Sequence, residues 1–184
     1  MKNTIALEKT TIKTKTLITL AAIISAVALP QVFHWAGLVS GLGGPQLGAA
    51  FLPMHIPVIV AGLLAGPIAG LIAGIISPLI SFGLAGMPVA AMLPFIMLEL
   101  AVYGMASGLL YKAKFPVFGK LIIAQIAGRV VRAGAVLAAA YALGGNTAIT
   151  AEYVFGFIVV GVPGILLQWA LIPLIIYRAK GRGK

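Results

Sequence analysis

Three charged side chains lie within stretches of the chain that are otherwise apolar: Glu99, Arg129 and Arg132. A charge inside a bilayer is costly, so it requires a partner or a function. Counted at about 1.5 Å per residue, Glu99 and Arg132 lie at similar depths in neighbouring predicted helices, and we expect them to pair. One carboxylate cannot neutralise two guanidinium groups. The remaining positive charge suits a bound carboxylate or phosphate, and the alternative is an ion pair that only joins the two helices.

Two further side chains are candidates for contact with a solute. His55 lies in the segment FLPMHIP between two prolines, where it could donate to or accept from a bound molecule, or could simply bond to a backbone carbonyl at a helix end. Tyr103 lies on the same predicted helix as Glu99, although tyrosine is also typical of the membrane interface. The other histidine, His34, has no Cys or carboxylate near it at ligand spacing, so no metal site is predicted.

The segment HWAGLVSGLGGPQLGAA, residues 34–50, is rich in glycine and is predicted to form a long loop. Such a loop could cover a pocket that opens outward. Trp35 and Gln46 lie in it and are candidate pocket residues, with a place at the membrane interface as the alternative for Trp35. Asn146 lies in a later loop on the same side, where it could cap the same pocket or only shape a turn.

Sequence motifs for catalysis are missing. The chain has no Walker motif, no HExxH, no GxSxG and no cysteine, and it shows no pair of carboxylates or serine with a histidine partner. We therefore predict that the protein is not an enzyme, that it cannot itself hydrolyse a nucleotide and that it needs no cofactor.

The composition is that of an integral membrane protein, with 61% hydrophobic and 9% charged residues. The net charge of +10 does not indicate nucleic-acid binding. Eleven of the thirteen Lys and Arg residues lie at the chain ends or around one short loop, which suits anionic lipid headgroups and membrane orientation.

Hydropathy predicts one membrane domain over residues 1–184, an all-α bundle of six transmembrane helices. The basic arm 1–16 precedes the first span, which is longer than the core of a signal peptide and is therefore expected to be retained. The basic tail 178–184 follows the last. The predicted spans are Leu17–Leu38, Leu52–Ala65, 67–84, Val89–Tyr111, Leu121–Leu143 and Tyr153–Tyr177. The arm, the loop around Lys114 and the tail lie on one side, and the opposite loops carry no Lys or Arg, so both termini are predicted to be cytoplasmic.

Glycines recur every four residues at Gly62, Gly66, Gly70 and Gly74. This spacing places small residues on one helical face and predicts close approach of neighbouring helix backbones.

Five segments together resemble a known family: FLPMHIPVIVAGLLAGP, SPLISFGLAGMP, LELAVYG, QIAGRVVRAG and PGILLQWALIP. They are similar to the successive signatures of the substrate-binding S-components of energy-coupling factor (ECF) vitamin transporters. Among the branches of that family the chain most resembles the pantothenate type. Cobalamin-type, pyridoxine-type and hydroxymethylpyrimidine-type members have related sequences.

The resemblance implies a multi-pass protein of a prokaryotic plasma membrane that captures a water-soluble vitamin at its outer face. It also implies partners, namely a membrane coupling subunit and two ATPase subunits that drive uptake. In the family a small-xxx-small motif on the first helix docks to the coupling subunit, and Ala22 and Ala26 fit that spacing, with Ala21 and Ser25 beside them. Ordinary packing within the bundle is the alternative for this pair.

The residues and the resemblance agree on an anionic solute, because pantothenate carries one carboxylate and the chain has surplus arginine. Two other function classes stay open. A stand-alone secondary transporter would be favoured by a proton dependence traced to Glu99, but no paired repeat of broken helices is apparent. An intramembrane enzyme would require turnover that depends on His55 or Glu99.

Overall fold

The computed structural model describes residues 12–41, 43–142, 144 and 147–181, which form helices joined by short turns. The N-terminal arm up to residue 11, Asn146 and the last three residues of the tail lie outside this described part. The helices are α1 (Ile12–Val39), α2 (Gly44–Phe51), α3 (His55–Ala65), α4 (Pro67–Ala85), α5 (Leu93–Leu109), α6 (Val117–Ala142), α7 (Thr147–Val160) and α8 (Val162–Gly181).

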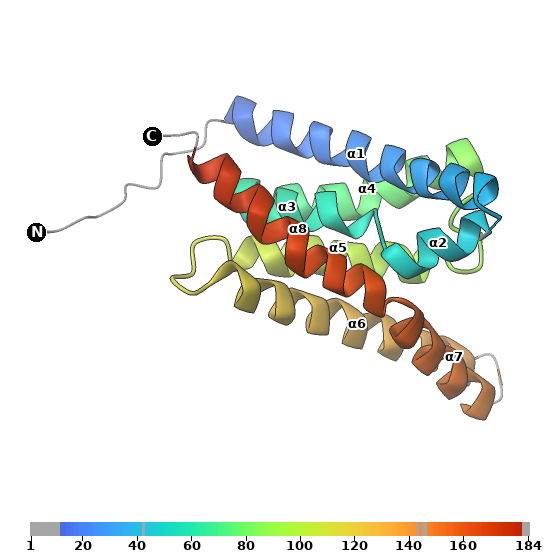
Figure 1. Ribbon diagram of the computed structural model, residues 1–184. Coiled ribbons are helices and arrows are strands. Elements are labelled where there is room, and N and C mark those ends of the chain that lie inside the picture. The colour runs from blue at the N-terminus through green and yellow to red at the C-terminus, as the bar shows by residue number, and fades with distance from the viewer. Residues whose placement is uncertain (1–11, 42, 143, 145–146, 182–184) are drawn as a thin grey trace, which may run out of the picture.

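The long helices run side by side along one direction, and the short α2 lies at one end of the bundle (Figure 1). The first described turn of α1 and the last turn of α8 lie together at the opposite end. Among the described residues, five helical segments are long and apolar enough to cross a bilayer, and α5 and residues Ala151–Val160 are shorter apolar helices. The chain is therefore an all-helical, multi-pass membrane protein.

The glycine-rich segment 34–50 is largely helical, so its prediction as a long loop was wrong. α1 continues through Trp35 to Val39, and α2 follows after a turn at Gly41, where φ is 72°. α2 has a proline in its first turn. Backbone N–H groups in the first turn have no acceptor within the helix, so the absence of an N–H in proline costs no hydrogen bond there. The glycines in this segment therefore mark the end of α1 and the start of α2, and not a long loop.

The last predicted span is also divided. α7 and α8 meet at Gly161, which is buried, and the backbone N–H of Gly161 still donates to the carbonyl of Phe157 at 3.3 Å. Pro163 follows within the first turn of α8 and has no N–H to donate to the end of α7. The chain therefore bends at Gly161 rather than continuing as one straight helix.

Glycines bring α3, α4 and α5 into backbone contact. A Cβ placed on Gly70 would collide with the backbone of Gly104, and one on Gly74 with the backbone of Leu100. Gly62 is equally close to α5. Gly66 departs from the predicted common face, because it forms the turn between α3 and α4 with φ at 99°, a conformation that favours glycine.

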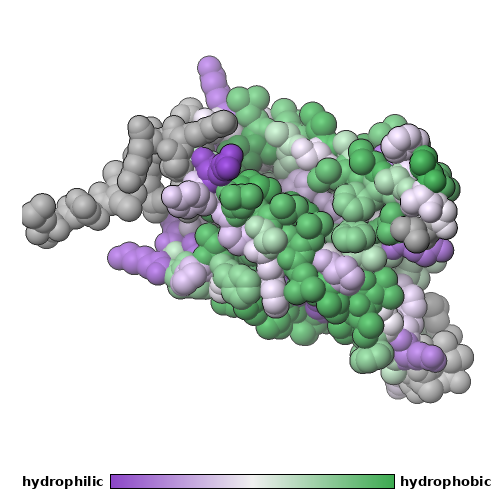
Figure 2. Space-filling model, viewed as in Figure 1, coloured by the Kyte–Doolittle hydropathy of each residue, from purple (hydrophilic) through white to green (hydrophobic). Residues whose placement is uncertain are grey.

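The bundle interior holds two clusters of buried apolar side chains. One joins α3, α5, α6 and α8, and the other joins α1, α3, α4 and α5: Ile56, Ile59, Leu63, Leu121, Ile172 and Ile176 in the first, and Ala26, Met54, Val58, Ala73 and Leu100 in the second. Figure 2 shows hydrophobic residues over most of the visible face, with hydrophilic residues gathered toward the two ends. This surface pattern matches a protein surrounded by lipid.

The small residues Ala22 and Ala26 of α1 face the bundle interior. They are 7% and 0% exposed and pack in the second cluster, which favours the alternative of packing within the bundle over docking for this pair. On α1 the outward small residues are Ala21, Ser25 and Ala28. Which of these two neighbouring sets of small residues is exposed depends on which face of α1 packs against the bundle.

Lys120 lies in the first turn of α6 and is only 5% exposed. Its Nζ donates to the backbone carbonyl of Tyr111 at 3.2 Å, and it lies over the ring of Phe115. A cation at the end of α5 also complements the helix dipole. Lys120 therefore joins the end of α5 to the start of α6.

Candidate functional site

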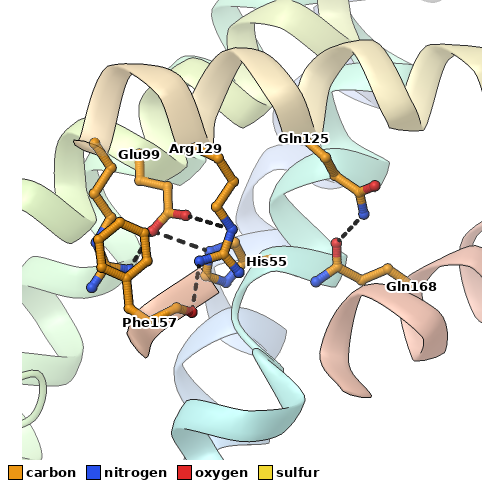
Figure 3. Close-up of polar contacts among 7 residues, drawn as sticks. His55, Glu99, Gln125, Arg129, Phe157 and Gln168 are labelled. Carbon is orange, nitrogen blue, oxygen red and sulfur yellow. Dashed lines mark hydrogen bonds and ion pairs between the residues drawn. The ribbon is translucent and has the colours of Figure 1, made fainter. Parts of the chain in front are cut away.

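Glu99 lies at the centre of a buried polar cluster formed by α3, α5 and α6 (Figure 3). Its Oε2 accepts a hydrogen bond from Nη1 of Arg132 at 2.7 Å. Its Oε1 lies 3.4 Å from Nε of Arg129, and Nε2 of His55 lies 3.7 Å from Oε2. The carboxylate is 0% exposed. The expected pair of Glu99 and Arg132 is therefore present, and Arg129 and the candidate histidine meet the same acid.

The same two arginines also hold α7. Nη1 of Arg129 donates to the backbone carbonyl of Phe157 at 3.2 Å. The guanidinium carbon of Arg132 lies 4.1 Å from the centre of the Phe157 ring, within the range of a cation–π interaction. α7 thus covers one side of the two guanidinium groups and limits their access to lipid.

A cavity of about 340 Å³ lies beside this cluster. It is at the end of the bundle opposite the first turn of α1 and the last turn of α8. Arg129, Arg132 and His55 line it, whereas Glu99 and Tyr103 do not. The remaining wall is mainly apolar. It comes from α1, α2, the turn before α3, α4, the segment before α5, the first turn of α5, and α7, and it includes Pro30, Leu52, Met54, Met87, Val89, Met92, Ile96 and Val160.

Several buried polar atoms of the residues that line this cavity have no hydrogen-bond partner within the described structure. They include Nη2 of Arg129, Nε of Arg132 and both ring nitrogens of His55, all of them buried. Unpartnered buried donors are costly unless a ligand or water pairs with them. The arrangement can therefore receive a molecule with oxygen acceptors, and two guanidinium groups give it the geometry for a carboxylate.

Tyr103 supports this site from behind. Its side chain is 1% exposed, and its ring meets the His55 ring edge-on with the centroids 5.1 Å apart. On its other side the ring packs against Gly128 of α6, where a Cβ would lie 3.1 Å from three ring carbons. Tyr103 therefore fixes the position of His55 and does not itself face the cavity.

The family comparison decides what kind of protein has this site. The family model for the ECF transporter, substrate-specific component, matches residues 15–176. The chain belongs to this family. No curated protein and no solved structure gives a match.

Membership gives the cavity its general role. ECF S-components are the substrate-binding subunits of transporters rather than enzymes, and they associate with the other ECF subunits. A buried cavity with unpartnered donors is what a substrate-binding membrane subunit requires. The matched range includes all the helices that line the cavity of this S-component.

Besides Glu99 and Tyr103, two predicted site residues within the described structure do not line the cavity. Trp35 is 68% exposed on α1, and Gln46 is exposed on α2; neither lines the cavity of this S-component. Both lie at the end of the bundle that holds the cavity, but on outer faces. Asn146 lies outside the described residues.

The side chains that line the cavity of this S-component and were missed by the sequence analysis include His34, Met92, Tyr153 and Phe157. The hydroxyl of Tyr153 lies 2.7 Å from Sδ of Met92 and connects α7 to the segment before α5. An aromatic or methionine in an apolar helix carries no signal that separates a pocket wall from a lipid-facing position. His34 is polar and could have been found, had residues 34–50 been recognised as helical.

A second buried polar group lies one turn along α6 from the site of this S-component (Figure 3). Nε2 of Gln125 donates to Oε1 of Gln168 at 2.8 Å, and Nε1 of Trp169 donates to Oε1 of Gln125 at 2.7 Å. These bonds connect α6 to α8 and satisfy polar atoms that lipid could not. They hold the helix that carries both arginines.

Proposed function

We propose that this S-component captures a small water-soluble vitamin with a single carboxylate, best represented by pantothenate. The vitamin would enter from the outer face, and ATPase subunits joined through the membrane coupling subunit would drive its uptake. The observation that carries the proposal is the cavity lined by two buried arginines that share one carboxylate, Glu99. Since His55 adds no negative charge, the cavity has an excess of one positive charge.

The size of the cavity supports a small solute. At about 340 Å³ it lies at the lower end of the range of about 300–1,000 Å³ for small-molecule sites. Cobalamin is much larger than such a space. Pyridoxine and hydroxymethylpyrimidine are small enough, but neither carries a carboxylate to pair with the guanidinium groups, so they rank below pantothenate.

The topology that we propose has six passes and both termini in the cytoplasm of a prokaryotic cell. α1, α3, α4, α5 and α6 each form one pass, and α7 with α8 forms the sixth. Because the chain has no cysteine, single cysteines can report on this directly. A cysteine at the exposed Lys114 should resist a membrane-impermeant thiol reagent in intact cells, and one at the exposed Tyr141 should react. Reaction at position 114 and protection at position 141 would show that both termini lie outside the cell.

Docking to the coupling subunit is proposed on the outward face of α1. Ala21, Ser25 and Ala28 are exposed there and recur at spacings of four and three residues, which places them on one side of the helix. This face replaces the buried pair Ala22 and Ala26. It keeps the family's principle of small residues that allow a close approach of helices.

The experiment that tests the proposed function is equilibrium binding by the purified protein in detergent. Labelled pantothenate is titrated, with cobalamin, pyridoxine and hydroxymethylpyrimidine as competitors. We expect saturable binding of pantothenate and no competition from the neutral vitamins. Competition by pyridoxine or hydroxymethylpyrimidine at equal strength would show that the arginines do not select a carboxylate. No binding of any of the four would refute this set of vitamins.

A further inference from the structure

Glu99 occupies an unusual place in the site, because it contacts the residues that bind and yet does not line the cavity. Arg129, Arg132 and His55 lie between its carboxylate and the cavity. A solute would therefore contact the arginines and would experience Glu99 through them. We propose that Glu99 is a positioning residue that restricts the site to solutes with one negative charge. This inference rests on the proposed capture of an anion.

The charges of the cluster support this restriction. Two guanidinium groups and one carboxylate leave one positive charge in a region that water does not reach freely. A solute with one carboxylate neutralises that charge. A solute with two would bring an uncompensated negative charge into the same buried region, where unpaired charge is strongly disfavoured. Glu99 thus sets the charge of the preferred solute, because it leaves one positive charge in the site for the solute to neutralise.

Glu99 cannot easily move away from the arginines. The residue that follows it, Leu100, is 0% exposed, and its backbone lies against Gly74 of α4. One turn further along, Gly104 lies against the backbone of Gly70. The carboxylate is therefore held in place by backbone packing of α5 on α4, and its charge stays in the site whether or not a solute is bound.

Replacing Glu99 by glutamine tests the inference, because glutamine has nearly the same shape and can still accept from Arg132. The E99Q site would carry a surplus of two positive charges. The probes are butyrate and succinate, four-carbon acids with one and two carboxylates, compared at equal ionic strength by calorimetry and by thermal stabilisation in detergent. We expect the wild-type protein to prefer butyrate. In E99Q the ratio of succinate to butyrate affinity should rise by at least about tenfold.

A second pair of variants guards against poor folding of E99Q, which leaves two buried arginines without a counter-ion. R132Q reduces the surplus to zero, and E99Q/R132Q restores it to one. Butyrate and pantothenate should bind more tightly to E99Q/R132Q than to R132Q, although the double variant differs further from wild type. A purely structural role of Glu99 would make the double variant the weaker of the two.

The outcomes separate the two proposals. If the wild-type protein binds pantothenate but E99Q and wild type show the same ratio for the two acids, or if the double variant binds no better than R132Q, the inference about Glu99 is wrong and the proposed function stands. If the wild-type protein binds none of the three acids, anion capture itself is wrong, and the inference falls with it.

Discussion

At the scale of single residues, the site consists of a few polar side chains in an apolar cavity wall. The arginines serve two purposes, since each contacts Glu99 as well as α7. A guanidinium group can do this because its donors point in several directions in one plane. The contacts to Glu99 and Phe157 keep both groups in place, while Nη2 of Arg129 and Nε of Arg132 have no hydrogen-bond partner within the described structure.

Arg132 should contribute strongly to binding. We expect Arg132→Ala to weaken pantothenate binding at least about 30-fold, since loss of one partner from a buried charge pair costs about 2 kcal/mol or more. Lys114→Ala is the matched control, because it removes an exposed cation at the other end of the bundle. Lys120 does not serve, because it is buried and bonded to Tyr111. Equal binding by the Arg132→Ala and Lys114→Ala proteins would remove Arg132 from the site.

Gly161 should matter because it leaves room for Arg129. A Cβ at this position would collide with Nη2 of Arg129. We expect Gly161→Ala to displace the guanidinium group and to weaken pantothenate binding by about tenfold, as overpacking costs about 1–3 kcal/mol. Gly156→Ala in the adjoining helix α7 is the control, since no atom lies within 4 Å of its added Cβ. The idea fails if both variants bind as tightly as wild type.

The residues that could be predicted from sequence were those whose charge is out of place in lipid. Glu99, Arg129, Arg132 and His55 do come together, because a buried charge must find a partner. Phe157 could not be predicted. It contributes a backbone carbonyl, which every residue has, and a ring face, and phenylalanine is common in apolar helices whether or not it meets a cation. Trp35 was selected because the segment around it was predicted to be a loop over a pocket, and only the orientation of α1 shows that it points outward.

At the scale of helices, close packing of α4 and α5 gives the site its rigidity. The predicted spacing of small residues was right for Gly62, Gly70 and Gly74, which meet α5. It could not distinguish Gly66, since a glycine at a turn and a glycine at an interface look alike in sequence. The bend at Gly161 had a signal in Pro163, but a proline is also tolerated inside a membrane helix, as Pro78 is in α4.

Gly104→Ala tests this packing. The added Cβ would meet the backbone of Gly70, which cannot turn aside as a side chain can, so the two helices must separate. We expect a loss of about 1–3 kcal/mol in stability, or a fall of about 2–10 °C in the melting temperature in detergent. Gly134→Ala in α6, whose Cβ would have no neighbour within 4 Å, should cause no loss. Equal melting temperatures would show that α4 and α5 tolerate a wider spacing.

At the scale of the whole molecule, the proposed capture site and the proposed docking face occupy different surfaces. The cavity lies at the end of the bundle opposite the first turn of α1 and the last turn of α8. The outward face of α1 runs along the side of the bundle, and its exposed small residues contact no cavity wall. The sequence could identify a small-residue pattern on α1 but not its register, because α1 is apolar on all sides and both faces carry alanine.

Separate surfaces predict separable defects. We expect Ala21→Leu and Ser25→Leu together to leave pantothenate binding by the purified protein unchanged, because both side chains point away from the bundle. ATP-driven uptake in cells that also contain the coupling and ATPase subunits should be lost, since leucine keeps the helices of the two subunits apart. The control is Ala22→Leu with Ala26→Leu, which places the same bulk in the core and should lower the melting temperature as well. Uptake at the wild-type rate by the outward variant would place the docking surface on another helix, and a melting temperature unchanged by the inward variant would contradict the orientation of α1.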